Sequence, residues 1–154
     1  MSFSDPILLT PPGHGQVLRA FGEDVTILVD GKKTGGACTQ WLEITPPGGG
    51  PPPHYHRHED ECFFVIEGTV SFFDGRTNAW TTGGPGWSAF MPRGSVHTFK
   101  NTGGCAAKML ITTTPSGFET YFARCAEVFA QAGAPDMARI MAISAEHGIH
   151  FVET

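Results

Sequence analysis

The sequence predicts an all-β protein of the barrel or jelly-roll type, and three observations support this prediction. Glycine and proline are abundant, with 20 Gly and 12 Pro among 154 residues, and 12 Phe accompany them. Between Val17 and about Thr114, short segments rich in β-branched and aromatic residues alternate with Gly- and Pro-rich turns, which is typical of antiparallel barrels. After Thr114 the hydrophobic period becomes helical. We therefore expect one domain, residues 1–154, with a barrel over about 17–114 and a helical tail over about 116–147.

Within the barrel region, Asp30-Gly31 and Asp74-Gly75 are expected to form two-residue hairpin turns, because Asp-Gly favours the type I′ geometry. The segments expected to form strands are Val17–Phe21, Val25–Val29, Ala37–Thr45, Cys62–Phe73, Thr77–Thr81, Trp87–Met91, Val96–Asn101 and Ala106–Thr114.

The tail is expected to form two short amphipathic helices and a closing strand, Ile149–Val152. Ser116 and Glu119 have the spacing of a capping box, and Pro135 suits the first position of the second helix. The apolar face of the first helix would comprise Phe118, Tyr121, Phe122, Cys125 and Phe129. The corresponding face of the second would comprise Met137, Ile140, Met141 and Ser144.

Composition excludes several classes of partner. The formal net charge is −5 and no cluster of Lys and Arg is present, so neither nucleic acid nor an anionic membrane is an expected partner. No secretory signal or membrane-spanning segment is recognisable. The 4 cysteines show no C-x-x-C spacing, which favours reduced thiols in a cytoplasmic protein.

Residues 54–61, HYHRHEDE, concentrate histidines and carboxylates in one short segment. Imidazoles at positions i and i+2 point the same way from an extended strand. A carboxylate on the returning chain and a histidine from a separate hairpin, such as His97, could then complete a metal site. Three neutral imidazoles and one carboxylate hold a divalent first-row ion well.

The spacings within two glycine-bounded segments are specific. They are Gly48-x5-His54-x-His56-x4-Glu61-x6-Gly68 and Gly86-x5-Pro92-x-Gly94-x2-His97-x3-Asn101. Both segments resemble the two signature motifs of the cupin superfamily, with every signature position occupied. The resemblance implies a double-stranded β-helix, the small jelly-roll barrel, with one divalent ion inside it (Fe, Mn, Ni, Zn, Co or Cu). Carried over position by position, the ligands would be His54, His56, Glu61 and His97.

Other interpretations of the cluster remain open. His56 and His58 could be the ligand pair, although that frame breaks the spacing to Glu61; otherwise His58 would lie at the rim. Glu59 and Asp60 are expected to be solvated turn carboxylates, or Asp60 could hold a ligand histidine through its second ring nitrogen. Glu61 could ligate the metal or act catalytically as a general base.

A pocket beside this site is expected to be lined by side chains that share strand parity with Glu61 and His97. These are Phe63, Val65 and Phe99, with Gln40, Leu42, Met109 and Ile111 as weaker candidates. His14, His147 and His150 are expected to be structural or surface residues.

A closer resemblance suggests a function. The stretch TGGACTQWLEITPPGGGPPPHYHRHEDECFFVIEGTVSF, the later TPSGFETYFARCAE and the tail ending in EHG are similar to bacterial single-domain cupins described as quercetin-dioxygenase-like. This resemblance implies a metal-dependent, dioxygenase-like oxidoreductase acting on a small chelating substrate, flavonol- or catechol-like. The alternatives are a non-catalytic binding or sensing module with a structural metal, and a metal-dependent isomerase or decarboxylase. Because many cupins pair and the helical face is apolar, we also expect a homodimer.

Overall fold

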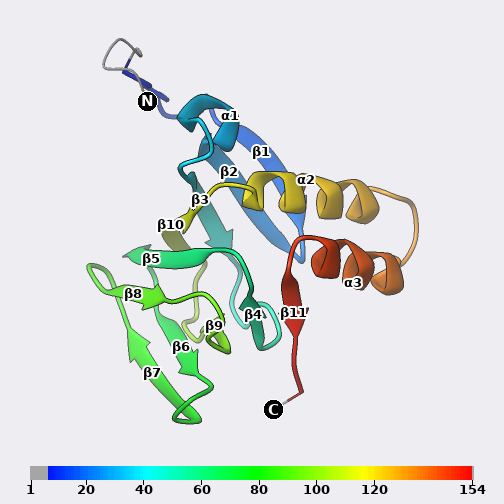
Figure 1. Cartoon of the computed structure of the whole chain (residues 1–154). Coiled ribbons are helices and arrows are strands. Elements are labelled where there is room, and N and C mark those ends of the chain that lie inside the picture. Colours follow the sequence, from blue (N-terminus) through cyan, green and yellow to red (C-terminus); the bar gives the residue numbers. More distant parts are fainter. Residues whose placement is uncertain (1–6, 154) are drawn as a thin grey trace.

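Two antiparallel sheets face each other in the computed structural model of the chain, which describes residues 7–153 (Figure 1). One sheet has six strands in the order β1-β2-β3-β10-β5-β8, and the other has five in the order β11-β4-β9-β6-β7. This jelly-roll arrangement confirms the predicted fold class. In chain order the elements are β1 (Gln16–Ala20), β2 (Glu23–Val29), α1 (Gly31–Thr34), β3 (Thr39–Thr45), β4 (His54–His56), β5 (Asp60–Glu67), β6 (Val70–Asp74), β7 (Ala79–Gly83), β8 (Ser88–Met91), β9 (His97–Asn101), β10 (Ala107–Thr114), α2 (Phe118–Phe129), α3 (Met137–Glu146) and β11 (Ile149–Phe151).

The hydrophobic core lies between the two sheets. Buried and less buried residues alternate along β3 and β10, because successive side chains of a strand point to opposite faces. Trp41, Ile111 and Phe63 lie opposite one another on β3, β10 and β5 and form one buried row. Across the core, Phe63 makes an edge-to-face contact with Phe72 of the other sheet and a tilted contact with Phe99. These aromatic contacts join the two sheets.

Three of the predicted local boundaries differ in the structure. Asp30-Gly31 is not a hairpin turn: the Asp30 carboxylate accepts the backbone N–H of Lys33 and caps the short helix α1. The predicted strand over residues 62–73 is two strands, which are separated at Gly68. The φ of Gly68 is 89°, and a Cβ atom at this position would clash with Ala107, so only glycine fits here. Asp74-Gly75 does begin a hairpin, but Asp74 pairs with Ala79 across a longer loop.

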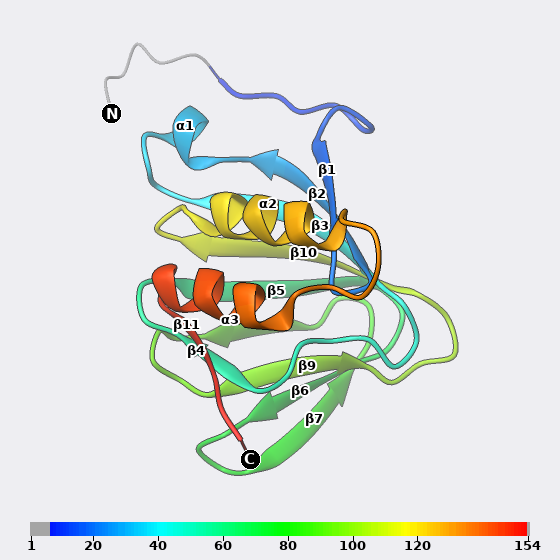
Figure 2. The same ribbon diagram turned by 90° about the vertical axis from the view of Figure 1, so that its right-hand side faces the viewer.

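The C-terminal tail forms two helices that lie side by side, with α2 against β1 and α3 against β11 (Figure 2). The predicted capping box is wrong, because α2 begins after Gly117, which provides no side-chain cap. Asp136, one residue after Pro135, caps α3. Helix α3 buries Ile140, Ile143 and Ser144 but leaves the methionines at positions 137 and 141 exposed, contrary to the predicted face.

The predicted closing strand is confirmed as β11, which pairs antiparallel with β4. Ile149 lies opposite His56, and Phe151 lies opposite His54. The C-terminal end of the chain therefore supports the short strand that carries the first two candidate ligands.

Within residues 7–153, no helix is long and apolar enough to cross a membrane.

The carboxylate of Glu119 connects α2 to the N-terminal part of the barrel. It accepts the backbone N–H groups of Gly31 and Gly117, each at 2.9 Å, and the hydroxyl of Thr39. Replacement by Ala removes this acceptor from the Gly31 N–H and the Thr39 hydroxyl, whereas the Gly117 N–H keeps the Thr39 oxygen at 3.2 Å. We expect Glu119→Ala to lower the free energy of unfolding by about 1–3 kcal/mol, measured by urea denaturation. Glu127→Ala, at an exposed site on the same helix, should change it little.

The effect of this substitution should depend on pH. Burial raises the pKa of Glu119, but the hydrogen bonds from Thr39 and the backbone outweigh it and hold the pKa below its usual range. A carboxyl with a depressed folded-state pKa contributes stability above its unfolded pKa and loses it as the pH falls through the folded value. The difference in the free energy of unfolding between the wild type and Glu119→Ala should therefore become smaller as the pH is lowered. A difference that stays constant from neutral pH to strong acid would contradict this role.

Candidate metal centre

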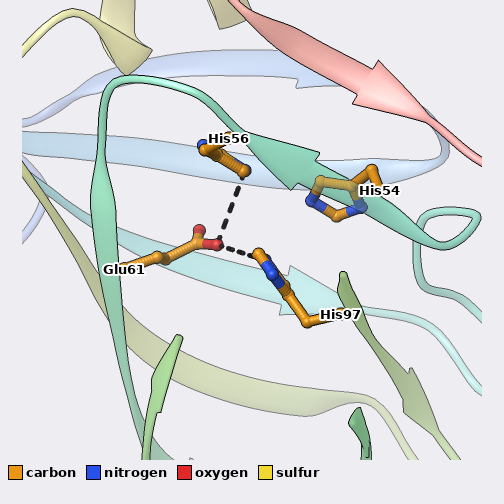
Figure 3. A group of neighbouring side chains, drawn as sticks. All are labelled: His54, His56, Glu61 and His97. Atoms are coloured by element: carbon orange, nitrogen blue, oxygen red, sulfur yellow. Dashed lines mark hydrogen bonds and ion pairs between the residues drawn. The ribbon is translucent and has the colours of Figure 1, made fainter. Parts of the chain in front are cut away.

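Four buried side chains converge between the two sheets (Figure 3). His54 and His56 project from β4 on the same side, with the half-buried Tyr55 between them. Glu61 comes from β5, and His97 is the first residue of β9, directly opposite His54 in the strand pairing. One ligand atom from each of the four residues lies within 4.8 Å of all the others. The structure thus brings together all four residues that the spacing and the resemblance indicate.

Two of the histidine rings are oriented by the nitrogen that faces away from the centre. The Nδ1 atoms of His54 and His97 lie 2.9 Å from the carbonyl oxygens of Pro52 and Ser95. A carbonyl oxygen only accepts, so both Nδ1 atoms carry the proton and the Nε2 lone pairs are left for the centre. Metal-binding histidines are held in this way in proteins. The Nδ1 of His56 lies 3.5 Å from the Glu59 carboxylate, without a hydrogen bond.

The Glu61 carboxylate faces the inner nitrogens of two of these rings. Its Oε2 lies 3.2 Å from Nε2 of His97 and 3.7 Å from Nε2 of His56. Because Nδ1 of His97 already carries a proton, a lone pair of His97 faces a carboxylate oxygen. Two electron-pair donors at this distance require a proton or a cation between them. The buried set of three imidazoles and one carboxylate suits a single divalent metal ion.

The protonation preferences of two of the donors agree with this role. Burial and the neighbouring His97 and His56 together lower the pKa of His54 to about 3, so the ring is neutral at pH 7. Burial lowers the pKa of His56, but the Glu59 and Glu61 carboxylates outweigh it and hold the pKa above its usual value. Burial raises the pKa of Glu61, but the contact with His97 and the positive charge that the surrounding rings can carry outweigh it, and the pKa lies below its usual range. Neutral imidazole and ionised carboxylate are the forms that bind metals.

Of the remaining charged groups of the cluster, only Glu59 takes a different role from the one expected. Glu59 is not a solvated turn carboxylate, because it is 7% exposed and faces His56. Asp60 does not hold a ligand histidine; its carboxylate accepts the backbone N–H and the guanidinium of Arg93 at 2.8–3.1 Å. His58 is exposed, outside the group of four, and packs near Gly148. The alternative pair of His56 and His58 is therefore wrong.

The other histidines lie apart from the group of four, as expected. The ring of His150 stacks on Tyr55 with centroids 5.1 Å apart. His147 caps the C-terminal end of α3 and its Nε2 lies 3.1 Å from the guanidinium of Arg124. His14 is exposed in the N-terminal segment.

A cavity of about 60 Å³ is lined by three of the four residues, His54, His56 and Glu61. The predicted pocket residues Phe63 and Phe99 line it, whereas Val65, Met109 and Ile111 lie in the core. Aromatic side chains from α2 and residues of β11 form much of the rest of the wall, namely Phe118, Tyr121, Phe122, Ile149 and Phe151. The C-terminal tail therefore contributes directly to the cavity.

The burial of three carboxyl groups near the site was not predicted from the sequence. One is Glu59, beside His56; the other two, Glu23 of β2 and Glu43 of β3, line the cavity and are 5% and 4% exposed. The sequence does contain a signal for Glu43, since it shares strand parity with Trp41 and Thr45 and therefore lies on the same inward face of its strand. A glutamate at an inward position of a predicted strand marks a buried polar group that needs an explanation.

Comparisons with known proteins identify the same architecture. A family model described as a cupin domain matches residues 41–113. A search of curated proteins finds no match.

Solved structures also resemble the chain. The polyketide cyclase RemF from Streptomyces resistomycificus is 22% identical, with 72% of this chain and 81% of that chain covered and a TM-score of 0.61. A "predicted oxalate decarboxylase" from Thermotoga maritima is 20% identical, with 60% and 80% covered and a TM-score of 0.57. The cupin domain of Cnp3 from Schizosaccharomyces pombe is 15% identical, with 68% and 72% covered and a TM-score of 0.57. The family match covers the segment that carries the four candidate ligands, and these solved structures share the fold of the chain.

Proposed function

We propose that the protein is a metal-dependent, dioxygenase-like oxidoreductase that acts on a small chelating molecule. The observation that carries the proposal is the buried group of His54, His56, Glu61 and His97, whose ligand atoms converge beside a cavity. Four protein ligands leave two positions of an octahedral ion free for a substrate. The similarity to quercetin-dioxygenase-like cupins provides the reaction class.

The chain's own residues would hold one divalent ion and shape its surroundings. When bound, the ion supplies Lewis acidity that polarises the oxygens of a chelating substrate. The carbonyls of Pro52 and Ser95 hold two of the rings in place, so little reorganisation is needed on binding. The aromatic wall excludes water and strengthens electrostatic interactions within the cavity. Glu61 acts in this proposal as a ligand, because its Oε2 points at the inner nitrogens of His56 and His97.

The dimensions of the cavity favour the small end of the proposed substrate class. One water needs roughly 10–15 Å³ of such a cavity, so the 60 Å³ present hold a few small groups and not a three-ring flavonol in this conformation. Among the described residues, the cavity wall includes no Arg or Lys. A dicarboxylate such as oxalate, which the names of some similar structures mention, would find only the metal as a positive partner. A neutral or singly charged chelator fits the wall better.

Metal content tests the proposal directly. Protein purified without chelator should contain about one equivalent of a first-row metal by plasma mass spectrometry, as expected for a site with a single group of four donors. His97→Ala should lose most of it, because the remaining three donors hold the ion more weakly. His58→Ala, in the same segment but exposed, should retain it. Metal-free wild type, or equal loss in both variants, would refute the proposal.

The reaction class is tested with the loaded protein. Oxygen uptake with catechols and smaller chelating diketones supports the dioxygenase assignment. Turnover that continues without oxygen identifies an isomerase or decarboxylase instead. A metal-loaded protein that binds these compounds without changing them is a binding or sensing module.

The Glu59 carboxylate should tune the affinity of the site. Its Oε2 lies 3.5 Å from Nδ1 of His56, and a metal on Nε2 would strengthen this contact by making the ring a better donor. We expect Glu59→Gln to weaken metal binding about 10–100-fold, measured by competition with a chromophoric chelator. Asp60→Asn is the matched control, since Asp60 pairs with Arg93. Equal affinities in wild type and Glu59→Gln would contradict the role.

We further propose a homodimer formed through the outer face of the six-stranded sheet. Ile44, Phe64 and Phe90, from β3, β5 and β8, are 44%, 45% and 61% exposed there, and the outward Leu42 and Leu110 are only half-buried. An exposed apolar patch of this kind is typical of an interaction surface.

Sedimentation measures this assembly. The wild type should sediment at twice the chain mass of 16.5 kDa, and Phe64→Lys combined with Phe90→Lys should give the monomer because charges are introduced on the apolar face. Trp80→Lys, at an exposed site on the other sheet, should leave the dimer intact. A wild type that is monomeric at high concentration would rule the dimer out.

A reducing, cytoplasmic location is also proposed. It is supported by the four cysteines, which are all free in the structure.

A further inference from the structure

Two buried glutamates form a second polar region in the wall of the metal cavity. Glu23 and Glu43 project inward from the neighbouring strands β2 and β3, near the register where Val25 lies opposite Glu43. Glu61 lies two strands farther along the same sheet, on the other side of β10. The pair therefore occupies a part of the wall distinct from the four candidate ligands.

The two carboxyl groups have different hydrogen-bonding environments. Glu43 accepts the indole N–H of Trp41 at 3.0 Å and the hydroxyl of Thr45 at 3.2 Å. Glu23 has an oxygen, Oε1, that is buried without any hydrogen-bond partner, although the residue is only 5% exposed and lines the cavity. An unpaired buried polar atom is costly. Here it is placed where a bound molecule could pair with it.

The charge of the pair is not neutralised by a nearby cation. Burial and the negative charge of Glu43 together raise the pKa of Glu23 to about 9, so Glu23 is neutral at pH 7. Burial also raises the pKa of Glu43 to about 7 against the hydrogen bond from Trp41, with Glu61 adding repulsion. The pair thus carries at least one proton at pH 7, whereas two free carboxylates carry none. No Arg or Lys belongs to the cavity wall within the described part of the chain.

We propose that Glu23 and Glu43 form a recognition subsite for an amino or hydroxyl group of a small ligand whose oxygens bind at the metal centre. The unpaired Oε1 of Glu23 and the acceptor oxygens of Glu43 would receive the hydrogen bonds of that group. This inference rests on the proposed metal centre and adds a ligand class: a metal chelator of about four to six non-hydrogen atoms, set by the cavity volume, with a donor at its other end. A carboxylate in the donor's place would be repelled.

Three hydroxamic acids of equal size test the subsite. Each binds a metal through the same two oxygens, but the group at the far end is a methyl in propionohydroxamic acid, a hydroxyl in glycolohydroxamic acid and an amino group in glycine hydroxamic acid. Their affinities for the full chain loaded with Zn²⁺ are measured by calorimetry at pH 7. Zinc content is measured in every sample, so a failure of the metal centre is seen separately as missing zinc and overturns both proposals.

The wild type should bind the amino and hydroxyl compounds about tenfold more tightly than the methyl compound, the effect of one hydrogen bond to a charged or desolvated acceptor. Glu43→Gln and Glu23→Gln should each bring this ratio of affinities closer to one, while the affinity for propionohydroxamic acid stays nearly unchanged. Glu67→Gln, an exposed glutamate of β5, should preserve it. Thermal unfolding checks each variant, and if one fails to fold, the other still tests the pair.

Three results would overturn the subsite in zinc-loaded protein. Equal affinity for the three compounds shows that nothing recognises the far end. A preference that survives in both variants shows that the donor contacts another group, such as the metal itself. Absence of binding by all three shows that a chelator cannot reach the metal, so no ligand could join the metal and the glutamates.

Discussion

The pairing of His54 with His97 is the constraint on which the site depends. It is the register contact between β4 and β9, and it joins the two sequence motifs that lie far apart along the chain. Strand β4 is only three residues long, too short to hold its position alone. Its other edge is paired with β11, so the C-terminal strand is as much a part of the site's scaffold as the motifs themselves.

Burial of four polar side chains beside one another would be unfavourable without a cation. The inner nitrogens of the rings and Oε2 of Glu61 face one another within 4.8 Å, and the outer nitrogens of His54 and His97 are already used in hydrogen bonds to carbonyls. Placing these groups together lowers the free energy of unfolding of the metal-free protein. Metal binding therefore adds to the stability of the folded form, by an amount that grows with the free metal concentration.

The sequence predicted the ligands better than their surroundings, for physical reasons. Strand parity and fixed turn lengths determine where His54, His56 and Glu61 point, and both can be read from spacing. Glu59 lies in the turn between β4 and β5, where no periodicity applies, so its burial was not predictable. Asp30-Gly31 was misread because an Asp can cap a helix as readily as it can begin a hairpin. The tail helices were predicted, but their buried faces depend on how each packs against the barrel.

The substrate depends on parts of the chain that the family resemblance does not cover. The cupin match spans residues 41–113 and includes all four candidate ligands. Much of the cavity wall lies outside it: Glu23 precedes the matched segment, whereas Phe118, Tyr121 and Phe151 follow it. The matched segment therefore contains the candidate metal ligands, while the N-terminal strands and the C-terminal tail supply much of the wall beside them. In this chain they close the cavity with aromatic rings and add the carboxyl group of Glu23. In the subsite that we propose, such a wall would favour small chelators that carry a hydrogen-bond donor over anions.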